Sequence, residues 1–188
     1  MSATIAAIAN LKGGVGKSTT TLMLADGLAY YYGADVLVVD LDPQANSSQM
    51  LLTDRGLQMA FEQGKGVHHL IKQFSDNKPP NLANLILPNA VTLEELRRAE
   101  ERDERMGWIS ILPAHTQLRL TEMELEEKLY TKGMAPSRLA SYLAGHMEKA
   151  LEPLSNLYDV ILIDTPPYLS PMARAGLSIA NHYVTPTL

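Results

Sequence analysis

The sequence predicts an α/β fold in which a doubly wound, mostly parallel sheet is flanked by helices. Three observations lead to this prediction: short apolar runs recur along the chain, segments with helical periodicity alternate with them, and several of the runs stop at an aspartate or a proline. Continuous apolar runs are typical of parallel strands that are covered on both faces. Strands that alternate with helices favour a parallel sheet with right-handed crossovers.

The amino-terminal part of the chain contributes two strands and one helix to this prediction. Residues 3–9 form an apolar strand that leads into a glycine-rich turn. Leucine, alanine and tyrosine recur at three- and four-residue spacing from Ser18 to Tyr32, which predicts a helix that ends at Gly33. A second strand at 36–39 ends before Pro43, because proline cannot continue the hydrogen-bonded ladder.

The carboxyl-terminal part of the chain repeats this alternation. Strands are predicted at 108–112 and 160–163, and each is followed closely by proline. Helices are predicted between them at about 117–131 and 137–152. Residues 182–188 resemble the start of another strand, so we expect a single domain over 1–188 that is truncated at its carboxyl-terminal end.

Residues 75–107 interrupt the alternation of strands and helices. Their first half is rich in turn residues, and their second half opens with a capping box that begins at Thr92. Ten of the twelve residues from Glu94 to Arg105 are charged, which favours a helix surrounded by solvent. We interpret this stretch as a polar, charged insertion. A partner-docking surface is the alternative, for which the sequence offers no specific support.

The composition excludes several classes of protein. A chain of 188 residues with 46% hydrophobic residues can bury one core without disulfides or a structural metal. The absence of cysteine excludes a thiolate zinc site, an iron–sulfur cluster and a cysteine nucleophile. No apolar run approaches the roughly 18 residues of a membrane span, and the start lacks a signal peptide, so a cytoplasmic location is expected. The net charge of -5 argues against a wholly basic nucleic-acid binder.

The strongest chemical signal is the segment at 12–19, KGGVGKST, which lies between the first strand and the first helix. Its glycines let the backbone turn with N–H groups pointing inward, and the helix amino terminus adds partial positive charge, which makes a cradle for phosphate. In such a loop Lys17 reaches the β- and γ-phosphates, Ser18 ligates Mg²⁺, and Thr19 contacts the α-phosphate. The predicted cofactor-binding residues are Lys12, Gly13, Gly14, Val15, Gly16, Lys17, Ser18 and Thr19.

One departure from the general phosphate-loop pattern is informative. Leu11 occupies the position of the first glycine, and a second lysine, Lys12, follows it. Here the sequence resembles the deviant Walker A class of P-loop ATPases, the ParA and MinD family, whose loop reads K-G-G-x-G-K-[S/T]. In that family the extra lysine crosses an ATP-sandwiched dimer, so the resemblance implies that Lys12 acts in trans. A cation on the γ-phosphate stabilises the charge of the phosphoryl-transfer transition state, so hydrolysis would depend on dimerisation.

Three aspartates follow apolar strands at the sheet edge where open α/β folds bind ligands. Asp40 and Asp42 follow the second strand and Asp164 follows the late one. An aspartate beside a phosphate loop suits the holding of Mg²⁺, whereas a turn-forming role is the alternative for each aspartate taken alone. The segments VVDLDPQAN and ILIDTPP are similar to ParA switch I and to its Walker B and switch II. The resemblance implies that Asp42 positions or activates the attacking water and that Asp40 supports the magnesium cluster. The expected catalytic residues are Lys12, Lys17 and Asp42, and the expected metal-binding residues are Ser18, Asp40 and Asp164.

The resemblance runs from Thr4 to Leu188 and is weakest across 75–107. The order D-L-D-P-Q favours ParA over MinD, and Leu-Pro-Ala at 112–114 before a leucine-rich helix is also typical of ParA. The absence of cysteine excludes the iron–sulfur nitrogenase reductase branch. Because the chain begins directly at its first strand, it resembles the short ParA type without a helix-turn-helix domain.

The resemblance implies a ParA-like ATP hydrolase that dimerises with ATP and Mg²⁺, binds DNA non-specifically at the nucleoid, and drives plasmid or chromosome partition with a ParB-like partner. The DNA prediction depends on the resemblance alone, because the sixteen lysines and arginines form no evident stripe. One alternative is a MinD-like membrane-associated ATPase, marked by a basic amphipathic carboxyl-terminal helix, or an orphan ParA-like ATPase that positions a protein cargo. Another is a stand-alone metabolic P-loop enzyme, against which Lys12 argues.

The five histidines are not expected to hold a metal. Their positions show no metal-ligand spacing, so we interpret them as ordinary surface or core residues. They are His68, His69, His115, His146 and His182.

Overall fold

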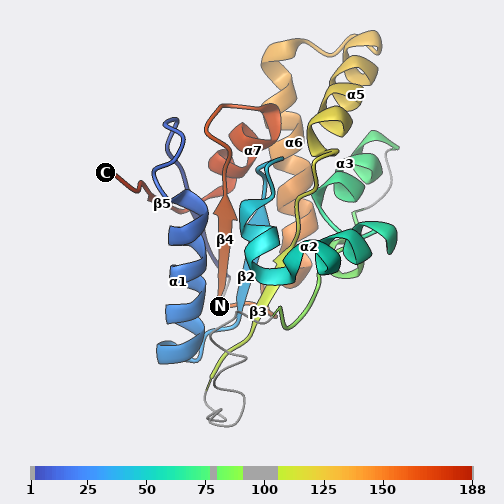
Figure 1. The fold of residues 1–188 in the computed structure, drawn as a ribbon. Helices are drawn as coiled ribbons and strands as arrows, with labels where there is room; N and C mark the ends of the chain where they lie inside the picture. The colour runs from blue at the N-terminus through green and yellow to red at the C-terminus, as the bar shows by residue number, and fades with distance from the viewer. Residues whose placement is uncertain (1–2, 77–79, 91–105, 188) are drawn as a thin grey trace.

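The computed structural model describes residues 3–76, 80–90 and 106–187 of the chain. Within these ranges, five parallel strands form one sheet in the order β3-β2-β4-β1-β5 (Figure 1). The strands are β1 (Thr4–Ile8), β2 (Val36–Asp40), β3 (Ile109–Leu112), β4 (Val160–Asp164) and β5 (His182–Val184). This sheet confirms the predicted doubly wound α/β fold.

The helices lie on both faces of the sheet (Figure 1). They are α1 (Lys17–Tyr32), α2 (Asn46–Glu62), α3 (Val67–Ser75), α5 (Leu118–Thr131), α6 (Pro136–Leu151) and α7 (Pro171–Ile179), with short 3₁₀ turns η1 (Leu82–Asn84) and η2 (Glu152–Leu154). In the described ranges, none of these helices is both long enough and apolar enough to cross a membrane.

Two apolar layers hold the helices to the sheet. Successive strand residues point to opposite faces, so each strand supplies both layers. Leu37 and Ile163 join α3, α5, α6 and α7 in the larger layer, whereas Ile8 and Val38 join α1 in the smaller one. Strands β2, β3 and β4 are buried over nearly their whole length, which is why they appear in the sequence as continuous apolar runs.

Three helices, α2, α3 and α7, were not predicted from the sequence, for local reasons. The segment that forms α2 contains Thr53 at φ 60°, ψ 166°, a break that interrupts the helical period in the middle of the element. The helices α3 and α7 have nine residues each, which is short for a periodic signal. The predicted helices at 117–131 and 137–152 are present as α5 and α6, with each end within one residue of its predicted position.

The described part of the segment 75–107 lies against the edge strand β3. Leu87 and Ile111 exchange backbone hydrogen bonds of 2.8 and 2.9 Å, and Ala90 N–H donates to the Ile109 carbonyl at 2.7 Å. The predicted charged helix at 94–105 lies outside the described residues. The sheet edge next to β3 is therefore covered by this short antiparallel contact.

Candidate phosphate-binding site

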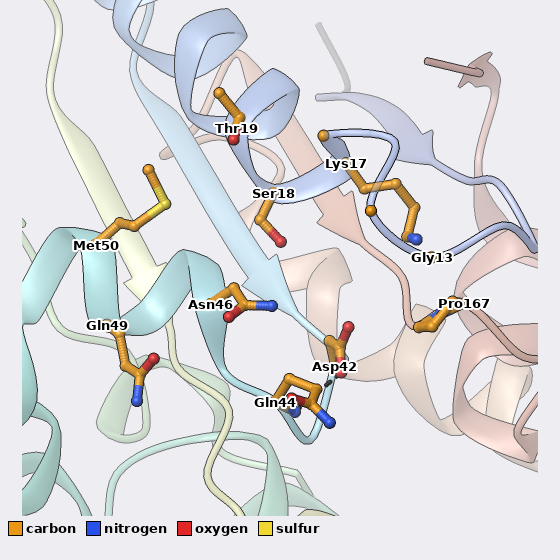
Figure 2. A pocket seen from close by; sticks show the side chains of 12 residues that line it. Gly13, Lys17, Ser18, Thr19, Asp42, Gln44, Asn46, Gln49, Met50 and Pro167 are labelled. Atoms are coloured by element: carbon orange, nitrogen blue, oxygen red, sulfur yellow. Dashed lines mark hydrogen bonds between the residues drawn. The ribbon is translucent and has the colours of Figure 1, made fainter. Parts of the chain in front are cut away.

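The loop between β1 and α1 has the backbone that a phosphate cradle requires. Gly14 and Gly16 adopt φ of 73° and 80°, a left-handed conformation that residues with a Cβ rarely adopt. Gly16 is also the residue that caps α1, so the loop ends on a helix amino terminus. The Lys17 side chain is buried, and its Nζ donates to the Lys12 carbonyl at 3.4 Å, which draws the ammonium back across the loop (Figure 2).

Asn10 ties this loop to the opposite end of the chain. Its Oδ1 accepts the Lys12 N–H at 2.9 Å, and its Nδ2 donates to the Pro186 carbonyl at 2.9 Å. The Lys12 backbone is therefore held by one side chain while the residue itself stays exposed to solvent. Asn10 gives no signal in the sequence, because a lone asparagine before a glycine-rich loop is an ordinary turn residue.

A cavity of about 670 Å³ lies between the loop and the start of α2. Figure 2 shows Ser18 and Lys17 on one wall, Asn46 on the wall formed by α2, and Asp42 and Pro167 at the far end. Of the predicted cofactor-binding residues, Val15 is buried in the protein, and neither Val15 nor Lys12 lines the cavity. The cavity-lining residues that sequence analysis missed are Gln44, Asn46, Gln49, Met50 and Pro167.

The sheet brings the three predicted aspartates together behind this cavity. Strand β4 lies between β1 and β2, so Asp164 is in register with both Ile8 and Asp40. Asp164 and Asp40 are fully buried, and Asp42, two residues after Asp40 and 5% exposed, lines the cavity. The order of the strands, which no local pattern reveals, is therefore what places Asp164 between the phosphate loop and Asp40.

One carboxylate oxygen of Asp164 accepts a hydrogen bond, and the other has no partner in the described residues. Its Oδ2 accepts the Ser47 hydroxyl at 2.6 Å, while its buried Oδ1 accepts no hydrogen bond from the residues that the structure describes. Burial and the charge of Asp42 raise the pKa of Asp164, and the hydroxyls of Ser47 and Ser18 oppose that rise. An unpaired buried carboxylate oxygen is costly, so this atom calls for a cation or a water.

Asp40, unlike Asp164, has hydrogen-bond donors at both of its carboxylate oxygens. Its Oδ1 accepts the Asp42 N–H at 3.0 Å, and its Oδ2 accepts both the N–H and the hydroxyl of Ser48, at 3.0 and 2.7 Å. Burial, followed by the neighbouring Asp164 charge, raises the pKa of Asp40 to about 8. Both of its oxygens are occupied, so the geometry suits a group that holds α2 and Asp42 in place better than a direct metal ligand.

The residues present fit a magnesium ion. Mg²⁺ prefers hard oxygen ligands and is bound in phosphate sites by one or two protein groups together with phosphates and waters. The Ser18 hydroxyl and the unpartnered Oδ1 of Asp164 supply such oxygens beside the loop. Asp42, whose Oδ1 accepts the Gln44 N–H at 2.9 Å, faces the cavity from the other side.

Two serines at the start of α2 complete the site. Ser47 donates to Asp164, and the Ser48 hydroxyl, besides donating to Asp40, accepts the Ala114 N–H at 2.9 Å. Ser48 thereby joins the ends of β2 and β3 to α2. A signal for these residues was present in the sequence, because Asn-Ser-Ser shortly after a strand is a common start for a helix.

Three of the histidines gather around Phe61, away from this cavity. His68 and His115 stack on the Phe61 ring at centroid distances of 4.6 and 3.9 Å, and His69 contacts His68 at 3.9 Å. His68 is fully buried, and neither of its ring nitrogens has a hydrogen-bond partner in the described residues. Within those residues no group of three or more histidine and carboxylate side chains is arranged to hold a metal.

Comparison with known proteins identifies the family of this chain. The sequence matches a family described as an AAA domain over residues 3–188. The chain belongs to this family, in its ParA/MinD branch. It is 32% identical over 182 residues to the sporulation initiation inhibitor protein Soj of Bacillus subtilis, and 33% identical over 180 residues to the chromosome-partitioning ATPase Soj of Thermus thermophilus.

A solved structure shares the fold. The cobyrinic acid a,c-diamide synthase of Mycobacterium smegmatis, crystallised with an ATP analogue and magnesium, superposes with a TM-score of 0.67 at 26% identity, over 98% of this ParA-family chain and 58% of that protein. The two Soj proteins are covered over 57% and 53% of their lengths, and they match 97% and 96% of this chain. The chain thus spans little more than half of these relatives.

Proposed function

We propose that this ParA-family chain is an ATP hydrolase that dimerises with ATP and Mg²⁺, binds DNA without sequence preference, and drives plasmid or chromosome partition with a ParB-like partner. One observation supports it above the others: a glycine-rich loop with an exposed Lys12 faces a buried aspartate, Asp164, that has an unpaired oxygen. The loop suits phosphate, and the free oxygen suits Mg²⁺.

The residues divide the chemistry among themselves. Lys17 and the loop N–H groups bind the phosphates, and Ser18 and Asp164 hold Mg²⁺, which neutralises phosphate charge when bound. Asp42 lines the cavity across from the loop, where it orients the attacking water. Asp40 holds Asp42 by its backbone N–H and α2 by Ser48, and therefore acts as a positioning residue.

Lys12 supplies the dependence on dimerisation. Its backbone is fixed by Asn10, and its residue is exposed and outside the lining of its own cavity. A second protomer facing this one is where such a lysine would reach a nucleotide. Hydrolysis then requires two chains, because the cation that stabilises the transition state comes from the partner.

DNA and a ParB-like activator are supported by resemblance and by the relative described as a chromosome-partitioning ATPase. The test is DNA binding by the Asp42→Ala variant with and without ATP and Mg²⁺, titrated with salt. DNA binding that requires both ATP and Mg²⁺ and weakens steeply as the salt concentration rises supports the proposal. The salt dependence is expected because protein contacts to DNA phosphates release bound counterions. Binding to anionic liposomes in place of DNA would support the MinD-like alternative, and binding to neither, with ATP still bound, would favour a protein cargo.

Matched variants separate the proposed roles. Lys17→Ala should abolish nucleotide binding, measured with a fluorescent ATP analogue. Asp42→Ala should bind ATP and stay dimeric without turnover, and Lys12→Ala should bind ATP but lose dimer-dependent turnover. Normal turnover by Asp42→Ala would contradict its assignment. Turnover that stays proportional to protein concentration at every dilution would contradict the requirement for two chains.

A further inference from the structure

The segment that leads from β4 to α7 contributes to the cavity beside the phosphate loop. We call residues 165–170 the β4–α7 strap. Its Pro167 lines the same end of the cavity as Asp42 (Figure 2). The Thr165 hydroxyl donates to the Ile8 carbonyl at 2.8 Å, which ties the start of the strap to β1. Two consecutive prolines then fix two further φ angles. The strap is therefore held in place at its amino-terminal end.

The other end of the strap is anchored by Glu122 of α5. This side chain is 3% exposed, and its Oε1 accepts the Ser170 hydroxyl at 2.8 Å. The same hydroxyl oxygen accepts the Ala173 N–H at 3.1 Å and so caps α7. A serine hydroxyl has a single proton to donate, and here Glu122 receives it. The orientation of the α7 cap is thus set by a side chain that lies 48 residues earlier in the chain.

Glu122 supplies directed hydrogen bonding as well as packing. Removing a carboxylate from water is unfavourable unless hydrogen bonds or charges compensate. Burial raises the pKa of Glu122, while the Ser170 hydroxyl and the charge of Arg119, whose Nη1 lies 3.4 Å from Oε2, oppose that rise. An apolar side chain of similar size would fill the same space without this penalty, but it would leave the Ser170 hydroxyl without its acceptor. The hydrogen bond to the strap is therefore what the carboxylate adds.

The anchor lies near the end of the cavity that Asp42 lines. Burial raises the pKa of the Tyr168 phenol in the middle of the strap, and the charges of Glu122 and Asp42 raise it further, so both carboxylates act on this residue. Tyr168 and Leu169 are 39% and 46% exposed, and they line a second cavity of about 190 Å³. Packing alone thus leaves the middle of the strap room to shift, and its two ends determine where Pro167 lies.

We propose that Glu122 is a positioning residue for hydrolysis, which acts through Ser170 and the β4–α7 strap to hold Pro167 at its end of the cavity. This inference rests on the proposed ATPase function. With the anchor in place, that end of the cavity is rigid, and a water oriented by Asp42 keeps one position relative to the phosphate. Without the anchor the strap shifts, the water is held in several positions, and turnover falls. Nucleotide binding is retained, because Lys17 and the loop N–H groups belong to a different segment of the chain.

The experiment compares ATP turnover with affinity for the fluorescent ATP analogue in the full chain. E122L removes the acceptor while it keeps the volume and the α7 cap, S170A removes the hydroxyl, and E122Q keeps an oxygen that can accept it. We expect kcat to fall at least about tenfold in E122L and in S170A, while KM and the analogue affinity stay within about threefold. E122Q should retain turnover within about threefold of the unchanged protein. The double variant E122L/S170A should be no slower than E122L, because the two residues act as one unit.

Matched controls and a second measurement separate the anchor from general stability and from hydrolysis. E124L replaces an exposed glutamate of α5, and S178A removes an exposed α7 hydroxyl that donates to the Arg174 carbonyl. Both controls should keep kcat within about twofold. Chymotrypsin cleavage after Tyr168, identified by mass spectrometry, reports how often the strap opens and requires no turnover. We expect cleavage at least about fivefold faster in E122L and S170A than in the controls. Urea denaturation followed by circular dichroism shows that each variant is folded.

The results that would contradict the proposal can be told apart. Turnover in E122L within about threefold of the unchanged protein would overturn the positioning role. Losses that multiply in the double variant, or an E122Q as slow as E122L, would do the same, because either result separates Glu122 from the Ser170 hydrogen bond. Equal cleavage in E122L and E124L would show that Glu122 does not anchor the strap. An unchanged protein that binds the analogue but never turns over ATP would instead overturn the proposed function, and with it the role in hydrolysis.

Discussion

The histidine cluster predicts a loss of stability in acid that a single substitution should remove. His68 is 1% exposed, and no carboxylate lies among the groups that act on it. Burial, and then the charges of His69, Lys72 and His115, lower the pKa of His68 to about 3. The ring is therefore neutral in the folded chain at every pH where an exposed histidine of the unfolded chain takes up a proton.

The difference in proton binding between the folded and unfolded chain sets how the free energy of unfolding changes with pH. The unfolded chain binds more protons than the folded chain between pH about 6.5 and about 3, so the free energy of unfolding falls as the pH falls through that window. At pH 5, which is 1.5 units below the ordinary value of 6.5, His68 alone removes about 2 kcal/mol, at 1.36 kcal/mol per unit. Burial also lowers the pKa of His69 and of His115, so they act in the same direction.

The measurement is urea denaturation at pH 7, 6 and 5, followed by circular dichroism, for the unchanged protein and for His68→Phe. The phenylalanine keeps a ring against Phe61 and cannot titrate. The raised pKa values of Asp40, Asp164 and Glu122 change the stability in the opposite direction as the pH falls. Because these carboxylates are present in both proteins, their contribution drops out of the difference, which isolates His68. We expect the variant to lose about 2 kcal/mol less between pH 7 and pH 5. Parallel curves for the two proteins, or an equal effect of replacing the exposed His182, would refute the reasoning.

Three further substitutions test other parts of the structure. Thr53→Gly should raise the free energy of unfolding by about 1 kcal/mol, because φ 60° with ψ 166° strains a residue that has a Cβ; a lower denaturation midpoint would contradict this. Ser48→Ala should lower the free energy of unfolding by about 2 to 4 kcal/mol, because it leaves the buried Ala114 N–H without an acceptor and removes one hydrogen bond to Asp40. Ser48→Thr keeps the hydroxyl and should retain most of the stability in the same denaturation assay. Asn10→Ala should lower the affinity for a fluorescent ATP analogue about tenfold with unchanged circular dichroism, and unchanged affinity would mean that the loop needs no tether.

Much of the fold could be predicted from the sequence, because strand burial and helix periodicity depend on residues that are close together in the chain. The buried strands at 36–40 and 160–164 are apolar up to the aspartate that ends each of them, and the α1 helix begins at the phosphate loop and is capped by Gly33 as its spacing predicts. The break at Thr53 hid α2, since a change of helical phase removes the periodic signal on which such a prediction depends. The doubly wound class survived these omissions because it depends on the strands.

For the site, local sequence determined the phosphate loop and the positions of the aspartates, because glycine conformation and strand termination are properties of a few neighbouring residues. Only the tertiary structure decided how the aspartates differ. The placement of β4 between β1 and β2 buries Asp164 with one unpaired oxygen, and Ser48 occupies Asp40 from a helix that begins six residues further along the chain. The same holds for the cluster of His68, His69 and His115 around Phe61, in which α2, α3 and the segment after β3 meet. Hydrogen bonding and desolvation depend on the neighbours that the fold brings together, and those neighbours are distant in the sequence.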